Sequence, residues 1–229
     1  MKHKNRKEMK HTDSEVKKLK NYHVEMWNLV QEQIDKSFAA LRNGDKEVAR
    51  EVISRERMVN AQELVVDHHC EDFIAMFSPV AIDLRFVISL IKITNNLERI
   101  GDFAKGIATF VIEQQSGAID AALAQELSLD KMMENARDML TLAREALIEE
   151  DTSLCRRVLM MDDLMDEINC RAPQILGAHI QKHPETAEEM IRLYALIRRI
   201  ERIGDRTGNI AEEIVFYVDA KELRHQKKL

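Results

Sequence analysis

Two copies of one short phrase carry the side chains of this chain that could do chemistry. Residues 97–102 read Leu-Glu-Arg-Ile-Gly-Asp, and residues 200–205, which lie 103 positions later, read Ile-Glu-Arg-Ile-Gly-Asp. Each copy sets a Glu and an Asp four residues apart, so in a helix both carboxylates leave one face on neighbouring turns. Like charges at that spacing repel by roughly a few tenths of a kcal/mol unless a cation joins them. The phrase therefore predicts a cation site in each half. Its carboxylates are Glu98, Asp102, Glu201 and Asp205.

Matching positions upstream extend both candidate sites. At an offset of 106, residues 56 and 60 correspond to residues 162 and 166, again four apart. If the helices that carry them pack beside the helices of the repeated phrase, each half can offer three or four oxygen-bearing side chains to one cation. Oxygen ligands without His or Cys favour Mg²⁺, Mn²⁺, Ca²⁺ or iron. The added candidate ligands are Glu56, Asn60, Asp162, Asp166, Asn209 and Glu212.

The two candidate sites differ in their number of ligands. Asn209 and Glu212 continue the second ladder of polar side chains, whereas the first half has Gly106 and Thr109 at those positions. All these side chains lie off the apolar stripe of their helices, so we expect the sites on the surface of the bundle. The alternative is a solvated acidic face whose carboxylates pair with nearby arginines. Repetition in both halves favours the cation sites.

A glycine stands inside each phrase, at positions 101 and 204. Glycine in the middle of a helix costs about 1 kcal/mol relative to alanine. We therefore expect another backbone or a ligand to approach closely there.

The composition favours an all-helical protein. Only seven Gly, three Pro and 5% aromatic residues occur among 229 residues, against 45% hydrophobic and 32% charged residues. The net charge is −6, but residues 1–20 hold eight Lys/Arg and three Asp/Glu, a net of +5, which leaves −11 on the remainder. An acidic body argues against a nucleic-acid partner. The basic segment is expected to be a solvated, frayed extension.

Cysteine usage and hydropathy indicate a cytoplasmic location. The three cysteines form no CxxC motif, which is typical of reduced thiols. No N-terminal signal sequence is visible, and no run of about 18 apolar residues occurs, so no direct membrane insertion is expected.

Helical spacing of apolar residues predicts three long helices in the first half. The first covers 22–41, and Asn43-Gly44-Asp45 ends it and caps the second, which covers 46–77. Ser78-Pro79 is a predicted N-cap and first-turn pair for the third helix, which Ser116-Gly117 ends.

The second half repeats this plan. A helix over 129–147 is followed by one capped by Asp151, in which Pro173 should cause a kink or an early end. His183-Pro184-Glu185 opens the last helix. We therefore expect an all-α fold of two tandem, pseudo-symmetric three-helix bundles. The expected division is a basic extension at 1–20, a first repeat at 21–117 and a second repeat at 118–229.

Other candidate chemistry is weak. The acidic, His- and Cys-containing run at 67–72 occupies consecutive helical positions that point in different directions, so it is interpreted as a polar helix face. A di-iron enzyme needs inward-facing Glu-x-x-His motifs, and the two present, at 8–11 and 222–225, lie in polar tails. No Walker loop, GxSxG motif or nucleophile arrangement is recognisable, so no catalytic residue is predicted.

The duplicated three-helix plan, the Glu-Arg-Ile-Gly-Asp phrase and the Pro-Val-Ala-Ile-Asp-Leu-Arg segment at 79–85 resemble the PhoU family of bacterial phosphate-uptake regulators. The resemblance covers residues 22–218. It implies a PhoU-like fold and a cytoplasmic, non-enzymatic accessory protein of the phosphate ABC transporter. Such a protein helps repress the phosphate regulon when phosphate is plentiful. Its implied partners are the transporter's ATPase subunit and a phosphate-sensing histidine kinase, and the expected assembly is a homodimer.

The resemblance also implies bound metal. The family's E(D)xxxD motifs hold divalent or trivalent ions (Mg, Mn, Fe or Zn), sometimes as clusters on the protein surface. They match the four pairs of positions given above. This sequence departs from the family pattern at Gly106 and Asn60, so we expect the first-half site to be the weaker one.

Three alternatives remain open at the level of sequence. One is a carboxylate-metal-dependent enzyme, a hydrolase or oxidase, on a helical bundle. Another is a chaperone-like helical scaffold whose acidic face has no special role. The third is an accessory protein of a sodium-coupled phosphate carrier rather than of the ABC transporter.

Overall fold

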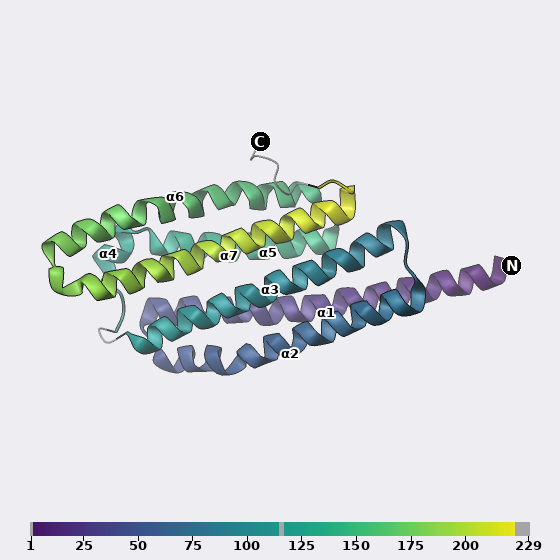
Figure 1. Cartoon of the computed structure of the whole chain (residues 1–229), viewed down its shortest axis with the longest axis horizontal. Coiled ribbons are helices and arrows are strands. Elements are labelled where there is room, and N and C mark those ends of the chain that lie inside the picture. The colour runs from purple at the N-terminus through teal and green to yellow at the C-terminus, as the bar shows by residue number, and fades with distance from the viewer. Residues whose placement is uncertain (1, 115–116, 223–229) are drawn as a thin grey trace.

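A computed structural model describes residues 2–114 and 117–222, with side chains from residue 14 onward. All long elements are α-helices, and the described part of the chain contains no strand. Figure 1 shows two groups of three long helices lying side by side, one from each half of the chain. This confirms the expected all-α fold of two tandem helical bundles. The division at residues 117 and 118 stays a prediction.

The first bundle consists of α1 (Lys2–Asn43), α2 (Lys46–Phe77) and α3 (Ala81–Glu113). The predicted turn between α1 and α2 is confirmed. Gly44 takes the left-handed conformation, with φ +63°, which glycine adopts without strain. Asp45 caps α2, because its Oδ1 accepts hydrogen bonds from the backbone N–H groups of Glu47 and Val48 at 2.9 and 3.1 Å.

The predicted cap of α3 is wrong. Ser78 instead ends α2 in the left-handed conformation, with φ 45°, and its backbone N–H donates to the carbonyl of Ile74. Val80 has extended backbone and precedes α3 without a side-chain capping bond. Three residues separate the helices, and Ser78 is needed to close α2, so it cannot also start α3. The predicted stop at Ser116-Gly117 falls partly outside the described residues, since Ser116 is not among them; α3 itself ends at Glu113.

The second bundle consists of α5 (Leu129–Glu149), α6 (Thr152–Lys182) and α7 (Ala187–Asp219). Asp151 caps α6 as predicted, with its Oδ1 accepting from the N–H of Ser153 at 2.8 Å. α6 continues past Pro173 to Lys182, so it does not end early there, and the alternative expectation of a kink at Pro173 stays a prediction. Two short elements were not predicted: α4 (Ala121–Glu126) before α5, and a 3₁₀ turn (Pro184–Thr186) between α6 and α7.

The core follows the two predicted apolar stripes. Each has seven positions, and every one of them is buried. Fully burying one Leu or Ile side chain contributes about 1.5–3 kcal/mol, so the stripes fix how the helices face each other. The α3 stripe is Leu90, Ile93, Leu97, Ile100, Ala104, Ile107 and Val111, and the α7 stripe is Leu193, Leu196, Ile200, Ile203, Thr207, Ile210 and Ile214.

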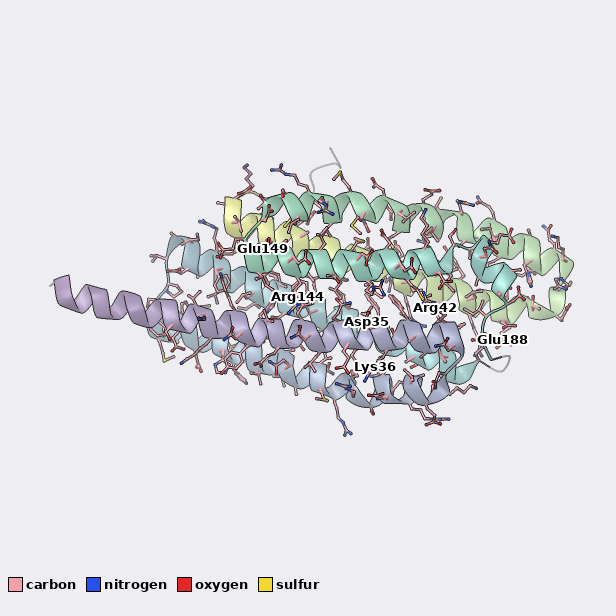
Figure 2. The ribbon with its side chains drawn as sticks, turned by 180° about the vertical axis from the view of Figure 1, so that it is seen from behind. Asp35, Lys36, Arg42, Arg144, Glu149 and Glu188 are labelled. Carbon is pink, nitrogen blue, oxygen red and sulfur yellow. The ribbon has the colours of Figure 1, made fainter. Side chains whose placement is uncertain are left out.

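The two bundles join mainly through α3 and α7, which pack against each other in the middle of the molecule. A second seam lies on the opposite side, where α1 runs beside α5 (Figure 2). There Nε of Arg42 donates to Oδ1 of Asp130 at 2.8 Å, and Asp35 and Arg144 lie along the same seam. Charged side chains therefore border the apolar junction.

The basic N-terminal segment belongs to α1. Its backbone is helical from Lys2, and its first turns extend beyond the other helices (Figure 1). Val16 and Leu19 pack against the core, so the expectation of a frayed extension is wrong for this part of the chain. No helix among the described residues is long and apolar enough to cross a bilayer.

Candidate metal centre

The packing of α2 along α3 and of α6 along α7 positions the predicted ligands. Each site draws one pair of positions from the middle helix of its bundle and the repeated phrase from the last helix. In the first half, the side chains of Glu56 and Glu98 are 16% and 14% exposed, whereas that of Asp102 is 37% exposed. The candidate site therefore lies at the surface of the bundle, where we expected it, and its carboxylates are partly removed from water.

In the first half, basic and amide groups already contact the predicted ligands. Nδ2 of Asn60 donates to Oε1 of Glu56 at 3.0 Å, and Nζ of Lys105 lies 3.1 Å from the same oxygen. The guanidinium of Arg99 lies 3.6 Å from Oε2 of Glu98 and 3.7 Å from Oδ2 of Asp102. The alternative interpretation, in which the carboxylates pair with nearby arginines, thus holds for part of the first-half site.

The electrostatics show that these carboxylates form one group. Burial raises the pKa of Glu98, and the neighbouring charges of Asp102, Glu63 and Glu56 raise it further, while Arg99 opposes them. Burial likewise raises the pKa of Glu63, with Asp67 and Asp102 adding to the shift. Bringing carboxylates together in a partly buried place disfavours their charged forms, and a cation reverses that effect.

Glu63 was missed at the level of sequence. It stands on α2 seven residues after Glu56 and three after Asn60, a spacing that places all three on one helix face. That signal was available, but the second half has Asn169 at the equivalent position. Comparing the two halves of the sequence therefore did not identify Glu63 as a candidate ligand.

In the second half, four predicted ligands act on one another. Burial raises the pKa of Glu201, followed by the charges of Asp205, Asp166 and Asp162, while Arg198 opposes the shift. Glu201 and Asp162 are half-buried, and Asp166 and Asp205 are exposed. The carboxylates of α6 and α7 thus lie near enough for their charges to act on Glu201, and their role as metal ligands stays a prediction. The other two candidates, Asn209 and Glu212, are half-buried on the following turns of α7.

The two glycines of the repeated phrase allow the middle helix to pack closely. A Cβ atom on Gly204 would lie 2.9 Å from Oδ1 of Asp162 and 3.1 Å from Cγ of Met165. A Cβ on Gly101 would lie 3.1 Å from Cγ1 of Val59. The expected close approach is real, but the approaching groups are side chains of the middle helix rather than another backbone. At Gly204 one of them is a predicted ligand.

Gly106, where the sequence departs from the family pattern, has a packing role. The side chain of Arg199, from the second half, lies against it, and a Cβ there would be 3.1 Å from Cδ and Nε of Arg199. The guanidinium also donates to the carbonyl of Gly106 at 3.3 Å. Gly106 therefore contributes to the packing between the two bundles and adds no oxygen-bearing side chain to the candidate site.

The donor set suits a hard cation in the second half. Among the described residues, no group of three or more His, Cys, Asp or Glu side chains stands in a geometry ready to hold a metal ion. Four mutually repelling carboxylates nevertheless meet across α6 and α7, and carboxylate oxygens are the ligands that Mg²⁺, Mn²⁺ and iron accept. The side chains are thus of the type that such an ion accepts, and their role as metal ligands stays a prediction.

The 67–72 run behaves as interpreted, whereas the Glu-x-x-His motifs at 8–11 and 222–225 extend outside the residues whose side chains the structure describes. In the 67–72 run, His69 stacks on Tyr22 with ring centroids 4.2 Å apart, exposed His68 pairs with Glu71 at 3.6 Å, and Cys70 is buried. These side chains point apart, as expected for a polar helix face. A cavity of about 670 Å³ between the end of α3 and the start of α7 is lined by mixed charges, where Arg192 contacts Glu188 at 2.8 Å.

The comparison with known families decides the relationship. Two segments, 24–111 and 129–214, match the sequence model of the PhoU domain, one in each bundle. The chain belongs to the PhoU family. The phosphate-specific transport system accessory protein PhoU of Edwardsiella tarda is 30% identical over 220 residues, which cover 94% of this chain and 89% of the relative. Its counterpart from Escherichia coli K12 is 29% identical over 213 residues, covering 93% and 87%.

Solved PhoU structures share the whole fold. The crystal structure of PhoU from Pseudomonas aeruginosa superposes with a TM-score of 0.86 at 26% identity, covering 91% of this chain and 99% of that one. The phosphate transport system regulatory protein PhoU from Streptococcus pneumoniae gives 0.84 at 25% identity, covering 93% and 99%. The resemblance stated from the motifs is therefore confirmed over nearly the full length, and both PhoU repeats are present.

Proposed function

We propose that this chain is a cytoplasmic, metal-binding accessory protein of a phosphate-specific transport system. It has no enzymatic activity of its own in this proposal. The observation that carries it is the pair of PhoU repeats, each with partly buried carboxylates gathered across two helices. The names of the relatives support the link to phosphate transport.

The carboxylates of the second half hold the principal metal in this proposal. Glu201, Asp205, Asp162 and Asp166 supply charge, and Asn209 and Glu212 add neutral and anionic oxygen donors on the same helix. A bound divalent or trivalent ion (Mg, Mn, Fe or Zn) supplies positive charge that neutralises these groups. The ion thereby fixes α6 relative to α7 on a surface available to a partner.

The regulatory role follows from association with the transporter. The proposed partners are the ATPase subunit of the phosphate ABC transporter and the phosphate-sensing histidine kinase, with the chain acting between them as a homodimer. When phosphate is plentiful, the complex helps to repress the phosphate regulon. An acidic body with a basic helical N-terminus suits protein partners of mixed charge better than nucleic acid.

Deleting the gene tests the regulatory role. A phosphate-starvation reporter should stay switched on in phosphate-rich medium in the deletion strain and return to repression on complementation. A reporter that remains repressed in the deletion strain contradicts this role. A co-purification with the transporter's ATPase subunit, compared with the same experiment on a sodium-coupled phosphate carrier, distinguishes the two possible transport partners.

Elemental analysis tests metal binding. Protein purified without chelator or metal-affinity tag should carry roughly one or more divalent or trivalent ions per half of the chain. The Asp205→Ala change should remove metal from the second half while leaving the helical circular-dichroism signal unchanged. Unaltered metal content in a Glu201→Ala/Asp205→Ala variant would rule out the assigned ligands.

A further inference from the structure

The outer face of α2 exposes a stripe of apolar side chains. This helix lies at the edge of the molecule and packs against α1 and α3 (Figure 1). On its remaining side, four apolar residues within eight positions face outward at helical spacing: Met58, Ala61, Leu64 and Val65. The three larger ones, Met58, Leu64 and Val65, are 48%, 60% and 38% exposed. A contiguous apolar stripe of this kind marks a surface that a partner can cover.

The duplicated helix of the second half supplies an internal comparison. The last three of these positions correspond, at the offset of 106, to Glu167, Cys170 and Arg171 of α6. Arg171 contacts Glu167 at 3.5 Å on the exposed surface, and Cys170 is exposed. Since α2 and α6 are the middle helices of their bundles, the fold does not itself require apolar residues there. The stripe on α2 therefore calls for an explanation other than the core of this chain.

Charged residues flank the stripe in a self-complementary order. Arg57 stands seven positions before Leu64 and Glu71 seven positions after it, and both charged side chains are exposed. Seven residues are about two turns, or roughly 10 Å, so all three lie on the same side of α2. If two α2 helices meet antiparallel about a two-fold axis at Leu64, Arg57 of each copy faces Glu71 of the other. The apolar stripe then closes on its own copy between two ion pairs.

We infer that the outer face of α2 is the surface through which two copies of this chain associate, antiparallel and with Leu64 at the two-fold axis. The inference rests on the homodimer proposed above and assigns it to one helix face. Burial of the stripe favours association, and the flanking charges set its direction, because a parallel pair would bring like charges together. The equivalent positions of α6 hold Asp163 and Gly177, so α6 lacks this charge pair.

Analytical ultracentrifugation of the full chain over a range of concentrations, with reductant present, tests this interface. The wild type should form a dimer, and Leu64→Glu should raise its dissociation constant at least about tenfold, because two carboxylates would meet at the axis. Cys170→Glu places the same charge at the equivalent position of α6 and should leave the dissociation constant unchanged. Both side chains are exposed, so circular dichroism should show unaltered helical content in both variants.

A charge exchange tests the antiparallel arrangement separately. Arg57→Glu and Glu71→Arg should each weaken the dimer about threefold or more, since each variant sets like charges opposite one another. The double variant Arg57→Glu/Glu71→Arg restores opposite charges across the axis and should recover most of the wild-type affinity. Additive losses in the double variant would overturn the proposed register.

The results distinguish this inference from the homodimer on which it rests. A wild-type dimer that Leu64→Glu leaves intact, or that Cys170→Glu weakens equally, overturns the assignment to α2 but keeps the homodimer. A wild type that stays monomeric up to about 100 μM contradicts both, and the stripe would then belong to a different protein partner or to none.

Discussion

Glu201 shows how a single residue can lower stability in the metal-free protein. Its carboxylate is half-buried and stands near three others, and burial followed by their charge raises its pKa above 4.5. The folded state therefore holds the proton more tightly than the unfolded state. Stability that comes from this group is present at low pH and is lost as pH rises through the raised pKa. At neutral pH the charged Glu201 carboxylate therefore destabilises the folded state, and a bound cation would remove this effect.

We therefore predict opposite effects of Glu201→Gln on stability and on metal binding. At pH 7 the metal-free variant should be more stable by a few tenths of a kcal/mol, about 1 °C in melting temperature after allowance for solvent screening. Its Mn²⁺ binding should weaken at the same time. Thermal melts with and without chelator measure both effects, and Glu25→Gln, at an exposed glutamate of α1, is the matched control. Lower stability of the metal-free variant would show that repulsion is not the dominant effect.

His23 illustrates a second kind of residue-level effect, in the core of the first bundle. Its ring is fully buried against Trp27, and Nδ1 lies 3.3 Å from Oγ1 of Thr94. Burial lowers its pKa from 6.5 to about 3, so the folded protein keeps the ring neutral. Because the unfolded chain takes up the proton first, the stability due to this group is present above pH 6.5 and is lost as pH falls toward about 3.

Replacing His23 should make the protein more resistant to acid. Below pH 6.5 the wild type should lose unfolding free energy by up to about 1.4 kcal/mol per pH unit because of this group. We predict that His23→Leu does not show this loss. Urea titrations at pH 7.5 and pH 5 measure the difference in slope, which separates this effect from any change in packing common to both pH values. His68→Leu, at an exposed histidine of α2, is the control. Identical pH dependence of wild type and His23→Leu contradicts the prediction.

At the scale of elements, the short connections could be predicted where one residue type dictates the geometry. Gly44 and Asp45 define the first turn, and Asp151 caps α6, because left-handed backbone favours glycine and an N-cap favours a carboxylate. Ser78 misled the prediction, since serine suits either a cap or a left-handed turn and the three-residue connection decides between them. The 3₁₀ turn after Lys182 depends on packing between helices, which no local pattern specifies.

The candidate site could be predicted to a similar extent. Duplication marked Glu98, Asp102, Glu201 and Asp205, and the offset of 106 marked their partners on the middle helices. The contact of Lys105 with Glu56 was not predictable from spacing, because it depends on how closely α2 approaches α3. That approach is set by the glycines in the repeated phrase.

The glycines offer a paired test of how helix packing positions a ligand. In Gly204→Ala, the new methyl group would stand 2.9 Å from Oδ1 of Asp162 and must push that carboxylate aside. Alanine also gains about 1 kcal/mol of helix propensity, which offsets the crowding of Met165. We predict a net change in stability within about 1 kcal/mol but roughly tenfold weaker Mn²⁺ binding, which is about 1.4 kcal/mol.

Gly101→Ala is the matched control for this change. The new methyl group crowds Cγ1 of Val59 at 3.1 Å, and Val59 is not a ligand. Stability should change by a similar amount, with Mn²⁺ binding at the second half unaltered. Equal losses of binding in both variants would mean that the backbone, rather than the position of Asp162, controls the site.

At the scale of the molecule, polar contacts lock α3 to α7 within an otherwise apolar junction. Oε2 of Glu213 is 3.2 Å from Nζ of Lys92, and the Glu213 side chain is only 2% exposed. The Lys92 ammonium also lies 5.3 Å from the ring centroid of Phe216. At the far end of the same junction, Arg199 reaches the carbonyl of Gly106. The apolar stripes could be predicted from sequence, but the partners of these polar groups could not, because they come from opposite halves.

This junction yields the last prediction. Lys92→Met leaves the buried carboxylate of Glu213 without its ammonium, so we expect a loss of about 2–3 kcal/mol of unfolding free energy, or roughly 4–12 °C in melting temperature. Adding Glu213→Gln removes the stranded charge and should recover at least half of that loss. Chemical denaturation of the wild type, both single variants and the double variant gives the coupling energy. Because the pair joins the two repeats, a large coupling would show that their association stabilises the whole chain. Additive losses would assign that role to the apolar stripes of α3 and α7 alone.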